Sequence, residues 1–483
     1  MAVIGLDIGT TGTKALVVDA NGEILSKGYH GYRLICDGRK IEQNADDWIS
    51  ASTLSIKEAL EKAKYPQIDA ISLSTQGGST VMVDENYRPV ENAWTWMDGR
   101  AAEEAKMLRE LFGNEYFYQT TGWKLGDCSD AAKIIYFKKK RSTSVKYLTT
   151  LEYANHFLTG QAVIDPSNAA MRQLFNIRQG NWDSEILRVV GITEADLPRL
   201  CPTGALVGGL TDSAARKLGL VAGIPVYNGG HDQYCASIGS GAIFDGDMLL
   251  SAGTTWVVMG ITEKPLFTDS FIAPGIHPIP GLFGNIASLV CSGVSFQWYK
   301  DNFLVEDFDA IDREIEKRYG GISALHFYPY LIGANHPVWN PAAKGTFTGF
   351  SLENDKFDFA RAIMEGVAFG LKQTLDDFGK NGLTAKKLKI MGGAANSMIW
   401  KRIVAAVVDI PIEQMREPDT CALGAAMIAA RGIGICDTYE QAARVFVHAD
   451  PLPAADSKEV SDYKKQYEEY QRMWDCVQVY YKQ

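Results

Sequence analysis

The chain has 483 residues, a formal net charge of −10, 46 % hydrophobic residues and 22 % charged residues. This length predicts two large domains or a few smaller ones. The acidic balance argues against nucleic acid as a main partner, because a phosphate backbone requires a basic surface. No stretch approaches the ~18 apolar residues of a membrane span, and no secretory signal pattern is present, so we expect a cytoplasmic protein.

The opening stretch "VIGLDIGTTGTKALVVDANGEIL" (3–25) predicts strand, glycine turn, strand, Asn-Gly turn and strand. The turn Gly9–Gly12 can direct backbone N–H groups and threonine hydroxyls at an oxyanion, and Lys14 can add a positive charge. Asp7 would repel a phosphate but can hold Mg²⁺, which then bridges to the phosphate. A plain hairpin with a capping aspartate explains this stretch equally well.

Strands alternate with helical patterns up to about residue 244. The clearest examples are a strand in "IDAISLSTQ" (68–76), a helix in "DGRAAEEAKMLRELFG" (98–113), and strand, glycines and helix in "GIPVYNGGHDQYCASIGSGAI" (223–243). Within the last stretch, Asp232 follows a strand and two glycines, where it can project into a cleft and accept a substrate proton. A helix cap is the alternative, and His231 is more typical of a structural residue.

A second start follows residue 246, in "DMLLSAGTTWVVMGITEKPL" (247–266), which repeats the order strand, Gly-Thr-Thr turn, strand. We interpret this as two similar α/β domains, each opening with a phosphate-facing hairpin. The sequence also predicts a helix over 357–379, strand, glycine turn and helix over 388–413, and a C-terminal amphipathic helix whose aromatic stripe packs inward.

Two further stretches suit ligands. "GGAANS" (392–397) is a strand-to-helix glycine turn against which an adenosine can lie, although the chain has neither GxGxxG there nor a GxxxxGK[ST] P-loop. "STQGGSTVMVDENYRPVENAWTWMDGR" (74–100) offers tryptophan, carboxylate and amide groups for a polyhydroxyl ligand, with a tryptophan in the domain core as the alternative. The eight cysteines form no CxxC pairs, so we expect buried, reduced thiols.

Taken in order, these motifs resemble the FGGY carbohydrate kinase family, within the actin-like ATPase superfamily, over nearly the whole chain. Further matching stretches are "EQNADDW" (42–48), "VGGLTDSAARKLGLVAGIPVYNGGHDQYCASIGSG" (207–241), "LLSAGTTWVV" (249–258), "YPYLIGANHPVWNPAAKGTFTGFSL" (328–352), "ARAIMEGVAFGL" (360–371) and "DTCALGAAMIAARGIG" (419–434).

The resemblance implies an α/β fold of two actin-like (ribonuclease H-like) domains with an interdomain cleft. Residues 1–244 would form an N-terminal domain with the sugar site and the catalytic aspartate. Residues 245–483 would form a C-terminal domain that binds ATP and ends in a terminal helix. The implied activity is ATP- and Mg²⁺-dependent phosphorylation of a sugar hydroxyl in carbohydrate catabolism. We expect a cytoplasmic enzyme with no nucleic-acid or membrane partner, for which a homodimer stays open.

By position in the family motifs, Asp232 would be the general base and Asp7 would hold Mg²⁺. The other implied contacts are Thr10, Thr11, Lys14, Gly253, Thr254 and Thr255 with the phosphates, Gly393, Ala394 and Asn396 with adenosine, and Gln76, Trp96, Asp98 and Arg100, together with Asp232, with the sugar.

Departures from the family pattern bear on the sugar. Xylulokinase-like members usually carry Met-His after the glutamine, where this chain has Gly77 and Gly78. Glycerol kinases usually carry "NQRE" here, which puts glycerol in doubt, and "GANHP" (333–337) stands where many members have Gly-Glu-Arg. We expect a ketopentose such as xylulose or ribulose, while a hexulose, an erythritol-like polyol and gluconate stay open.

Two other classes of protein are weighed against a kinase. An actin-like ATP-binding sensor would need no sugar platform, so the residues from Trp96 to Arg100 argue against it. A degenerate kinase acting as a regulator is disfavoured, because Asp7 and Asp232 are both present and no helix-turn-helix extension is found.

Overall fold

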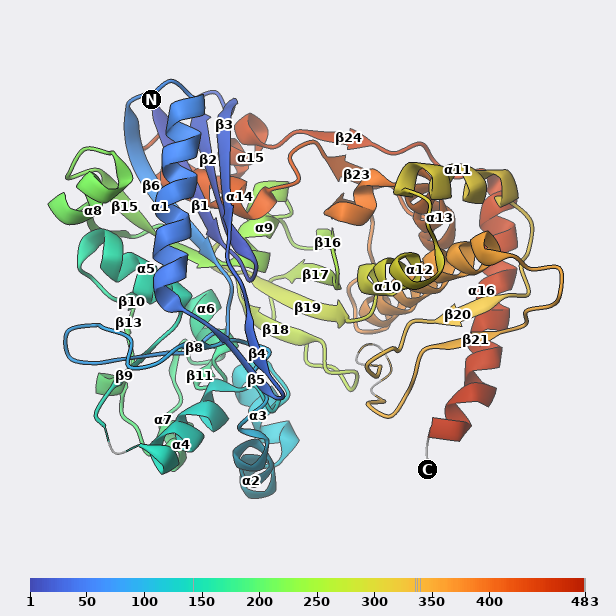
Figure 1. Ribbon diagram of the computed structural model, residues 1–483, viewed down its shortest axis with the longest axis horizontal. Coiled ribbons are helices and arrows are strands. Elements are labelled where there is room, and N and C mark those ends of the chain that lie inside the picture. Colours follow the sequence, from blue (N-terminus) through green and yellow to red (C-terminus); the bar gives the residue numbers. More distant parts are fainter. Residues whose placement is uncertain (142, 335, 337, 339, 482–483) are drawn as a thin grey trace.

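The computed structural model describes residues 1–141, 143–334, 336, 338 and 340–481, without the side chains of residues 114, 394 and 395. "GANHP" (333–337), noted above as a departure, therefore lies partly outside the described residues. The chain forms two α/β units side by side, with the N-terminus on the first unit and the C-terminal helix on the far edge of the second (Figure 1).

The first sheet has the strand order β14-β15-β6-β1-β2-β3. Strands β15, β6 and β1 are parallel, whereas β2, β3 and β14 are antiparallel to their neighbours. The bounds are β1 Ala2–Ile8, β2 Gly12–Asp19, β3 Ile24–Gly31, β6 Ile68–Thr75, β14 Leu206–Gly209 and β15 Pro225–His231. The three-strand meander predicted for residues 3–25 and the strand predicted at 68–76 are confirmed.

Both faces of this sheet are buried, which is why most side chains of β1 and β2 are apolar. Side chains alternate between the faces of a strand. Ile4 and Leu6 point to a core shared with α1 (Ala45–Lys62), α5 (Thr150–Thr159) and α8 (Asp212–Leu218). Val3 and Leu16 point to a core shared with α9 (Asp232–Ser240), α14 (Thr420–Gly432) and α15 (Tyr439–Phe446).

Helices α9 and α14 lie between the two sheets (Figure 1). They pack backbone against backbone, since a Cβ on Gly239 would lie 2.0 Å from the Thr420 carbonyl oxygen and one on Gly424 would lie 1.9 Å from that of Cys235. The second half of the chain thus returns to cover the first sheet. The domain division predicted between residues 244 and 245 stays a prediction.

The second sheet has the strand order β18-β19-β17-β16-β22-β23-β24. It repeats the plan of the first, because its central strand β16 is antiparallel to β17 and parallel to β22, as β1 is to β2 and β6. Two similar α/β units, as predicted, are confirmed. The bounds are β16 Met248–Ala252, β17 Trp256–Thr262, β18 Ala273–Ile276, β19 Phe283–Leu289, β22 Leu388–Met391, β23 Ile412–Met415 and β24 Ala449–Pro451.

Among the described residues, five helices share one core with the second sheet: α10 Gly293–Phe303, α11 Phe308–Arg318, α12 Lys356–Lys380, α13 Met398–Val408 and α16 Ser457–Val477. The helices predicted at 357–379 and at the C-terminus are confirmed. Tyr463, Tyr470 and Trp474 of α16 are buried in the same core, so the aromatic stripe packs inward as expected.

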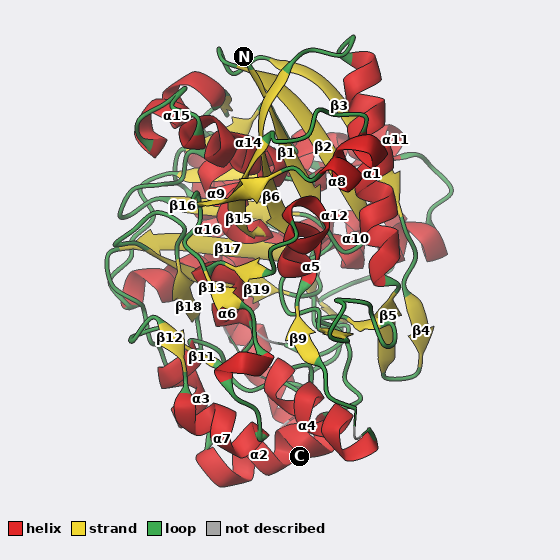
Figure 2. Cartoon of the chain, turned by 90° about the vertical axis from the view of Figure 1, so that its left-hand side faces the viewer, coloured by secondary structure: helices red, strands yellow, loops and turns green. Residues whose placement is uncertain are grey.

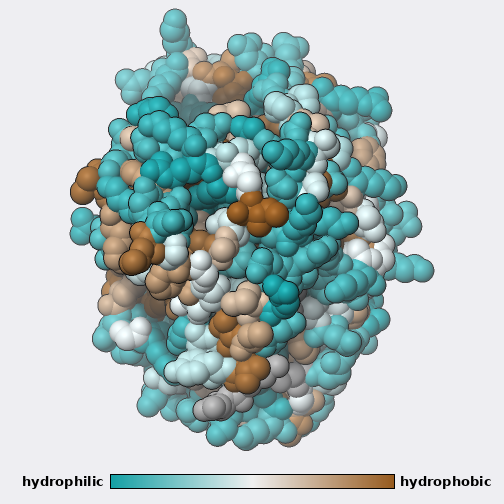
Figure 3. Space-filling model, turned by 90° about the vertical axis from the view of Figure 1, so that its right-hand side faces the viewer, coloured by the Kyte–Doolittle hydropathy of each residue, from teal (hydrophilic) through white to brown (hydrophobic). Residues whose placement is uncertain are grey.

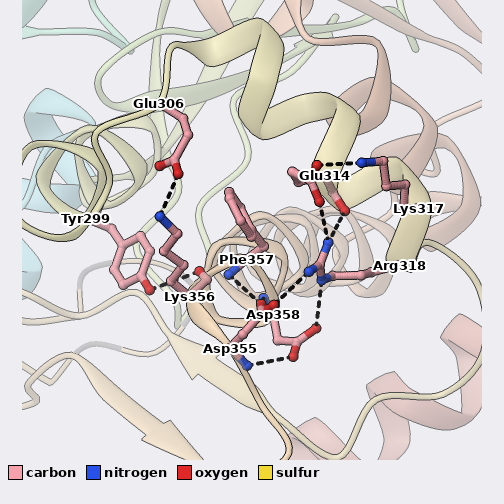
Figure 4. A network of polar contacts seen from close by, with 9 residues as sticks. All are labelled: Tyr299, Glu306, Glu314, Lys317, Arg318, Asp355, Lys356, Phe357 and Asp358. Carbon is pink, nitrogen blue, oxygen red and sulfur yellow. Dashed lines mark hydrogen bonds and ion pairs between the residues drawn. The ribbon is translucent and has the colours of Figure 1, made fainter.

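The start of α12 is tied to its neighbours by polar contacts (Figure 4). Arg318 at the end of α11 pairs with Asp355, the N-cap of α12, at 2.6 Å. Lys356 pairs with Glu306 at 2.5 Å, and the Tyr299 hydroxyl of α10 donates to the Lys356 carbonyl at 3.0 Å. These contacts hold α10, α11 and α12 in one arrangement around the cavity described below.

A helical layer with its own core is inserted between β6 and β15, at the bottom of Figure 2. It contains α2, which begins at Ala102 within the predicted range 98–113. The remaining elements are β4 Ile35–Asp37, β5 Lys40–Gln43, β7 Val81–Val83, β8 Ala93–Trp94, α2 Ala102–Phe112, α3 Asn114–Thr121, α4 Asp130–Lys140, β9 Lys146–Leu148, β10 Val163–Ile164, α6 Pro166–Met171, β11 Phe175–Asn176, β12 Asn181–Trp182, α7 Ser184–Val190, η1 Glu194–Asp196, β13 Arg199–Leu200, β20 His326–Tyr328, β21 Thr346–Thr348, η2 Gly393–Asn396 and η3 Gln478–Tyr481.

The face of the second unit in Figure 3 is mostly hydrophilic, with hydrophobic side chains in several small groups. None of the described helices combines the length and apolar character needed to cross a bilayer. All eight cysteines are free thiols. The expectation that they are buried is wrong for Cys36 and Cys476, which are exposed on β4 and α16.

Candidate active site

Asp7 lies near the end of β1, opposite Lys14 on β2 and Ser74 on β6. Its Oδ1 accepts a hydrogen bond from Ser74 Oγ at 2.8 Å. Burial, followed by the negative charge of Asp232, raises the pKa of Asp7 to about 7. The carboxyl ends of the parallel strands therefore bring the two predicted carboxylates into electrostatic contact.

Asp232 is the first residue of α9, directly after β15. Strand β15 packs tightly on β6, since a Cβ on Gly229 would lie 1.7 Å from the Leu73 carbonyl oxygen. The backbone N–H of His231, two residues after Gly229, donates to Ser167 Oγ at 2.9 Å. The Asp232 side chain is 26 % exposed, so a carboxylate held on a rigid strand end is still open to a ligand.

The first Gly-Thr-Thr turn is supported by side chains beneath it. Gly9 N–H closes the turn on the Gly12 carbonyl at 3.0 Å, and Gln43 Nε2 donates to the Thr10 carbonyl at 2.6 Å. Trp96 Nε1 donates to the Thr10 hydroxyl at 3.1 Å. This last bond links the predicted phosphate turn to the predicted sugar platform.

Thr11 is exposed on the same turn, and Lys14 is the third residue of β2, the strand that follows the turn. In this structure the Lys14 ammonium pairs with Asp419 at 2.6 Å, and Lys27 pairs with the same carboxylate at 3.2 Å. Burial lowers the pKa of Lys14, but its hydrogen bond to Asp419 raises that pKa overall. Lys14, predicted to contact the phosphates, is thus paired in this structure with Asp419, the residue before α14.

The second Gly-Thr-Thr turn connects β16 to β17 and borders a cavity of 570 Å³. Of the predicted nucleotide residues, Gly253, Thr254, Gly393 and Asn396 line this cavity. Thr255 Oγ1 instead donates to the Val290 carbonyl at 3.1 Å. The backbone of Ala394 lies in η2, and its side chain is outside the described residues.

The cavity wall also contains residues that the sequence analysis missed, and all of them belong to the second half of the chain. Trp400 lies 5.4 Å from Trp256 and 5.3 Å from Phe296, measured between ring centroids. Ser397 caps α13 and donates to Asp312 Oδ2 at 2.7 Å. The signal in the sequence was weak, because only Trp400 and Ser397 directly follow the glycine turn. The missed wall residues are Gly293, Val294, Phe296, Gln297, Phe308, Asp309, Asp312, Met364, Ser397 and Trp400.

Three of the predicted sugar residues are engaged with protein partners. Gln76 Nε2 donates to Gln43 Oε1 at 2.8 Å, which supports the first turn from below. Asp98 is fully buried and pairs with Arg100 at 2.6 Å, and Arg100 also pairs with Glu42 at 2.5 Å. These three side chains are therefore bonded to protein partners in this structure.

Trp96 differs from them, because its side chain is 45 % exposed. The glycine turn next to it is fixed by a residue that the sequence analysis missed. Lys133 of α4 is buried and its Nζ donates to the Gly78 carbonyl at 2.8 Å. Burial lowers the pKa of Lys133, and Asp130 lies 3.8 Å away. No local motif marks this lysine, which stands in an apolar helical pattern.

The predicted Mg²⁺ site at Asp7 has few protein ligands. Among the described residues no cluster of three or more histidine, cysteine or carboxylate groups is suited to a metal ion. Asp7 nevertheless offers a hard oxygen ligand with a raised pKa near a second carboxylate. Mg²⁺ commonly takes one or two carboxylates and completes its shell with water and phosphate oxygens, so these residues fit it.

Two protein-family models match the chain. The N-terminal domain model of the FGGY family of carbohydrate kinases matches residues 2–239, and the C-terminal domain model matches residues 248–433. The chain belongs to the FGGY family of carbohydrate kinases. It is therefore a sugar kinase enzyme, and kinases of this family use ATP.

Individual relatives carry different sugar names. The chain is 26 % identical to a xylulose kinase from Staphylococcus epidermidis, over 98 % of this chain and 96 % of that one. It is also 26 % identical to a gluconokinase from Bacillus subtilis, over 91 % and 89 %. Crystal structures of a gluconate kinase and a ligand-bound xylulose kinase, both from Lactobacillus acidophilus, each superimpose with a TM-score of 0.92 at 24 % identity and 99 % coverage of both chains. These structures share the fold.

Proposed function

We propose that this FGGY kinase transfers the terminal phosphoryl group of ATP to a hydroxyl of a ketopentose such as xylulose or ribulose, in carbohydrate catabolism in the cytoplasm. The observation that carries the proposal is the position of Asp232, a partly exposed carboxylate at the end of a buried parallel strand and in electrostatic contact with Asp7. A carboxylate placed in this way can orient and deprotonate a sugar hydroxyl.

The two carboxylates have different roles in this proposal. Asp232 accepts the proton of the attacking hydroxyl, late in a loose transition state, so its main task is to aim the oxygen. Asp7 would hold Mg²⁺, and the ion would neutralise charge on the phosphates. The pKa of Asp7 supports this separation of roles, because the negative charge of Asp232 raises it. A cation bound at Asp7 would offset this repulsion between the two carboxylates.

The nucleotide is held from both units. The cavity beside Gly393 and Asn396 takes the adenosine, and the second turn directs backbone N–H groups of Gly253–Thr255 at the phosphates. From the first unit, Thr10 and Thr11 face the same phosphates, and Lys14 joins them when it leaves Asp419. Transfer then occurs in a cleft between the units, with the sugar on the Asp232 side.

We propose a neutral sugar because Arg100 and Lys133, two positive side chains on the sugar side, are already bonded to protein groups. Gluconate carries a carboxylate and would need an available positive group. Arg100, predicted to contact the sugar, is already paired with Asp98 and Glu42, and Lys133 is buried and bonded to the Gly78 carbonyl. These commitments favour a ketose over an aldonate, although xylulose kinases and gluconokinases are equally similar in sequence.

A coupled ADP-release assay with a sugar panel tests the proposal. The panel holds D-xylulose, D-ribulose, a hexulose, erythritol, glycerol and gluconate. We expect the highest kcat/KM with a pentulose and no measurable turnover with glycerol. A clear preference for gluconate would overturn the sugar assignment, and ATP binding without turnover on any of them would overturn the ketopentose proposal and favour an actin-like ATP-binding sensor.

A further inference from the structure

His231 lies beside Asp232 and uses one of its two ring nitrogens. Nδ1 accepts the backbone N–H of Gln233 at 3.3 Å, which caps α9, and lies 3.3 Å from Oδ1 of Asp232. Because Nδ1 accepts a hydrogen bond, the proton of the neutral ring is on Nε2. Nε2 has no hydrogen-bond partner in the part of the chain that the structure describes.

The imidazole is held firmly in this position. The His231 backbone N–H is bound to Ser167 Oγ, and that hydroxyl in turn donates to Asp165. The ring of Tyr234 packs edge-on with a centroid distance of 5.7 Å, and only 6 % of the His231 side chain is exposed. Nε2 is not one of the fully buried polar atoms that lack a partner in the described residues, so an oxygen from outside the protein can reach it and accept its hydrogen bond.

Gly77 faces this ring directly. A Cβ on Gly77 would lie 2.4 Å from Cδ2 and 2.8 Å from Nε2 of His231. Both distances are too short for any side chain, so residue 77 has to be glycine while the ring occupies this place. The turn at Gly77 and Gly78 therefore packs against the ring of His231, the last residue of β15, with no space for a side chain at residue 77.

Gly78 gives the same kind of room on the other side of the turn. Its φ of +67° is in the left-handed region, and a Cβ there would lie 3.2 Å from the Cβ of Trp96. The Lys133 ammonium holds the Gly78 carbonyl from beneath. The two glycines thus lie between His231 and Trp96, and their turn cannot shift without breaking a buried bond.

We infer that His231 is a specificity-determining residue whose Nε2–H donates a hydrogen bond to a second oxygen of the sugar, next to the hydroxyl that Asp232 orients. The inference rests on the proposed function, because it places the sugar at Asp232. In this chain the donor is the last residue of β15, directly before the base at the start of α9, and Gly77 leaves the space for it. The ligand is a polyhydroxyl compound with a hydroxyl or carbonyl oxygen close to the phosphorylated position.

A matched pair of substitutions separates this role from simple helix capping. His231→Asn keeps an acceptor for the Gln233 N–H, and asparagine is a good N-cap, but its amide is too short to reach the position of Nε2. His231→Gln places an amide N–H near Nε2 and gives up the cap. The two variants therefore remove one function each.

We expect His231→Asn to raise KM for the best sugar of the panel about tenfold, because one hydrogen bond to the sugar is lost. KM for ATP and the melting temperature should not change. His231→Gln should raise KM for the sugar less than this and should lower the melting temperature. The opposite order, with an unchanged KM in His231→Asn and a raised KM in His231→Gln, would show that the residue only caps α9 and would overturn the inference while leaving the kinase assignment intact.

Gly77 provides an independent test through non-additivity. Gly77→Ala should raise KM for the sugar in the wild-type background, because it displaces the ring, and should have a smaller effect in a His231→Ala background. Equal effects of Gly77→Ala in both backgrounds would contradict the fit between the two residues.

Calorimetric titration with the same sugars distinguishes failure of the inference from failure of the proposed function. If a sugar binds but is not phosphorylated, weaker binding by His231→Asn supports the inference although the proposed function is wrong. If no sugar either binds or is phosphorylated, both are overturned.

Discussion

The two Gly-Thr-Thr turns contain the same residues but are supported in different ways. Around Gly9–Thr11 the support comes from side chains, and the Trp96 indole bonds the Thr10 hydroxyl. Around Gly253–Thr255 it comes from the segment that leads into α10, since the Val294 N–H donates to the Thr254 carbonyl at 3.0 Å and Thr255 Oγ1 donates to the Val290 carbonyl at 3.1 Å. The first turn is thereby linked to the sugar platform, and the second borders a cavity large enough for a nucleoside.

The strands that lead into the turns differ as well. Two residues before the glycine, the first strand carries Asp7 and the second carries Ser251. A carboxylate therefore stands at one turn and a hydroxyl at the equivalent point of the other. We infer that the same strand-turn-strand unit serves two tasks, since the charge at the first turn suits a metal ion and the neutral second turn suits a nucleotide.

The largest expected effect comes from replacing Asp7 by asparagine, which makes the first strand resemble the second in charge. Asn keeps an acceptor for Ser74 Oγ but loses the charge for Mg²⁺, so kcat should fall about 100-fold or more. The same variant should melt at a higher temperature at pH 8, by a few degrees, because it removes a charge that burial and Asp232 oppose.

The pH dependence of this stabilisation follows from the pKa. Folding raises the pKa of Asp7 from 3.8 to about 7, so the wild-type chain loses stability as pH rises between these values and no more above them. The gain from Asp7→Asn should therefore be larger at pH 8 than at pH 5, in calorimetry without Mg²⁺. A gain that is the same at both pH values would show that Asp7 ionises normally.

Trp96→Ala and Asn396→Ala compare the two regions directly. Trp96→Ala should raise KM for the sugar about tenfold and KM for ATP much less, since the exposed indole belongs to the sugar side. Asn396→Ala should do the reverse by a few-fold, because Asn396 lines the cavity. Trp96→Phe is the control that keeps the ring and removes the bond to Thr10. Equal effects of Trp96→Ala on both substrates would remove Trp96 from the sugar site.

A smaller effect is expected from Asp419→Asn, which removes the carboxylate that pairs with Lys14 and Lys27. Lys14 follows the first Gly-Thr-Thr turn. The pair is partly exposed, so the melting temperature should change little. KM for ATP should fall two- to threefold as Lys14 becomes available to the phosphates. A rise in KM for ATP would show that Asp419 itself assists the nucleotide.

The features that could be predicted from the sequence are local ones. The first meander, the strand ending at Thr75 and the long α12 follow from hydrophobic period and turn residues that lie next to each other. The position of Asp232 at a strand end was readable for the same reason, because glycines and a following helix mark the boundary.

The features that could not be predicted join distant parts of the chain. The ion pair of Lys14 with Asp419 and the packing of α14 on the first sheet connect residues about 400 apart, and neither leaves a local pattern. Lys133 was hidden because a buried lysine in an apolar helix looks like an exposed one until its partner, the Gly78 carbonyl, is known. The role of Gly77 likewise depends on a ring from another strand.

The proposed mechanism depends most on Asp232 as the base that receives the sugar proton, and replacing this one residue tests it directly. Sugar-dependent ADP release by Asp232→Asn is measured at saturating ATP and the best sugar of the panel, with ATP affinity measured by calorimetry on the same sample. The account predicts a loss of about 100-fold or more in kcat with unchanged ATP affinity. Turnover at the wild-type rate would contradict it.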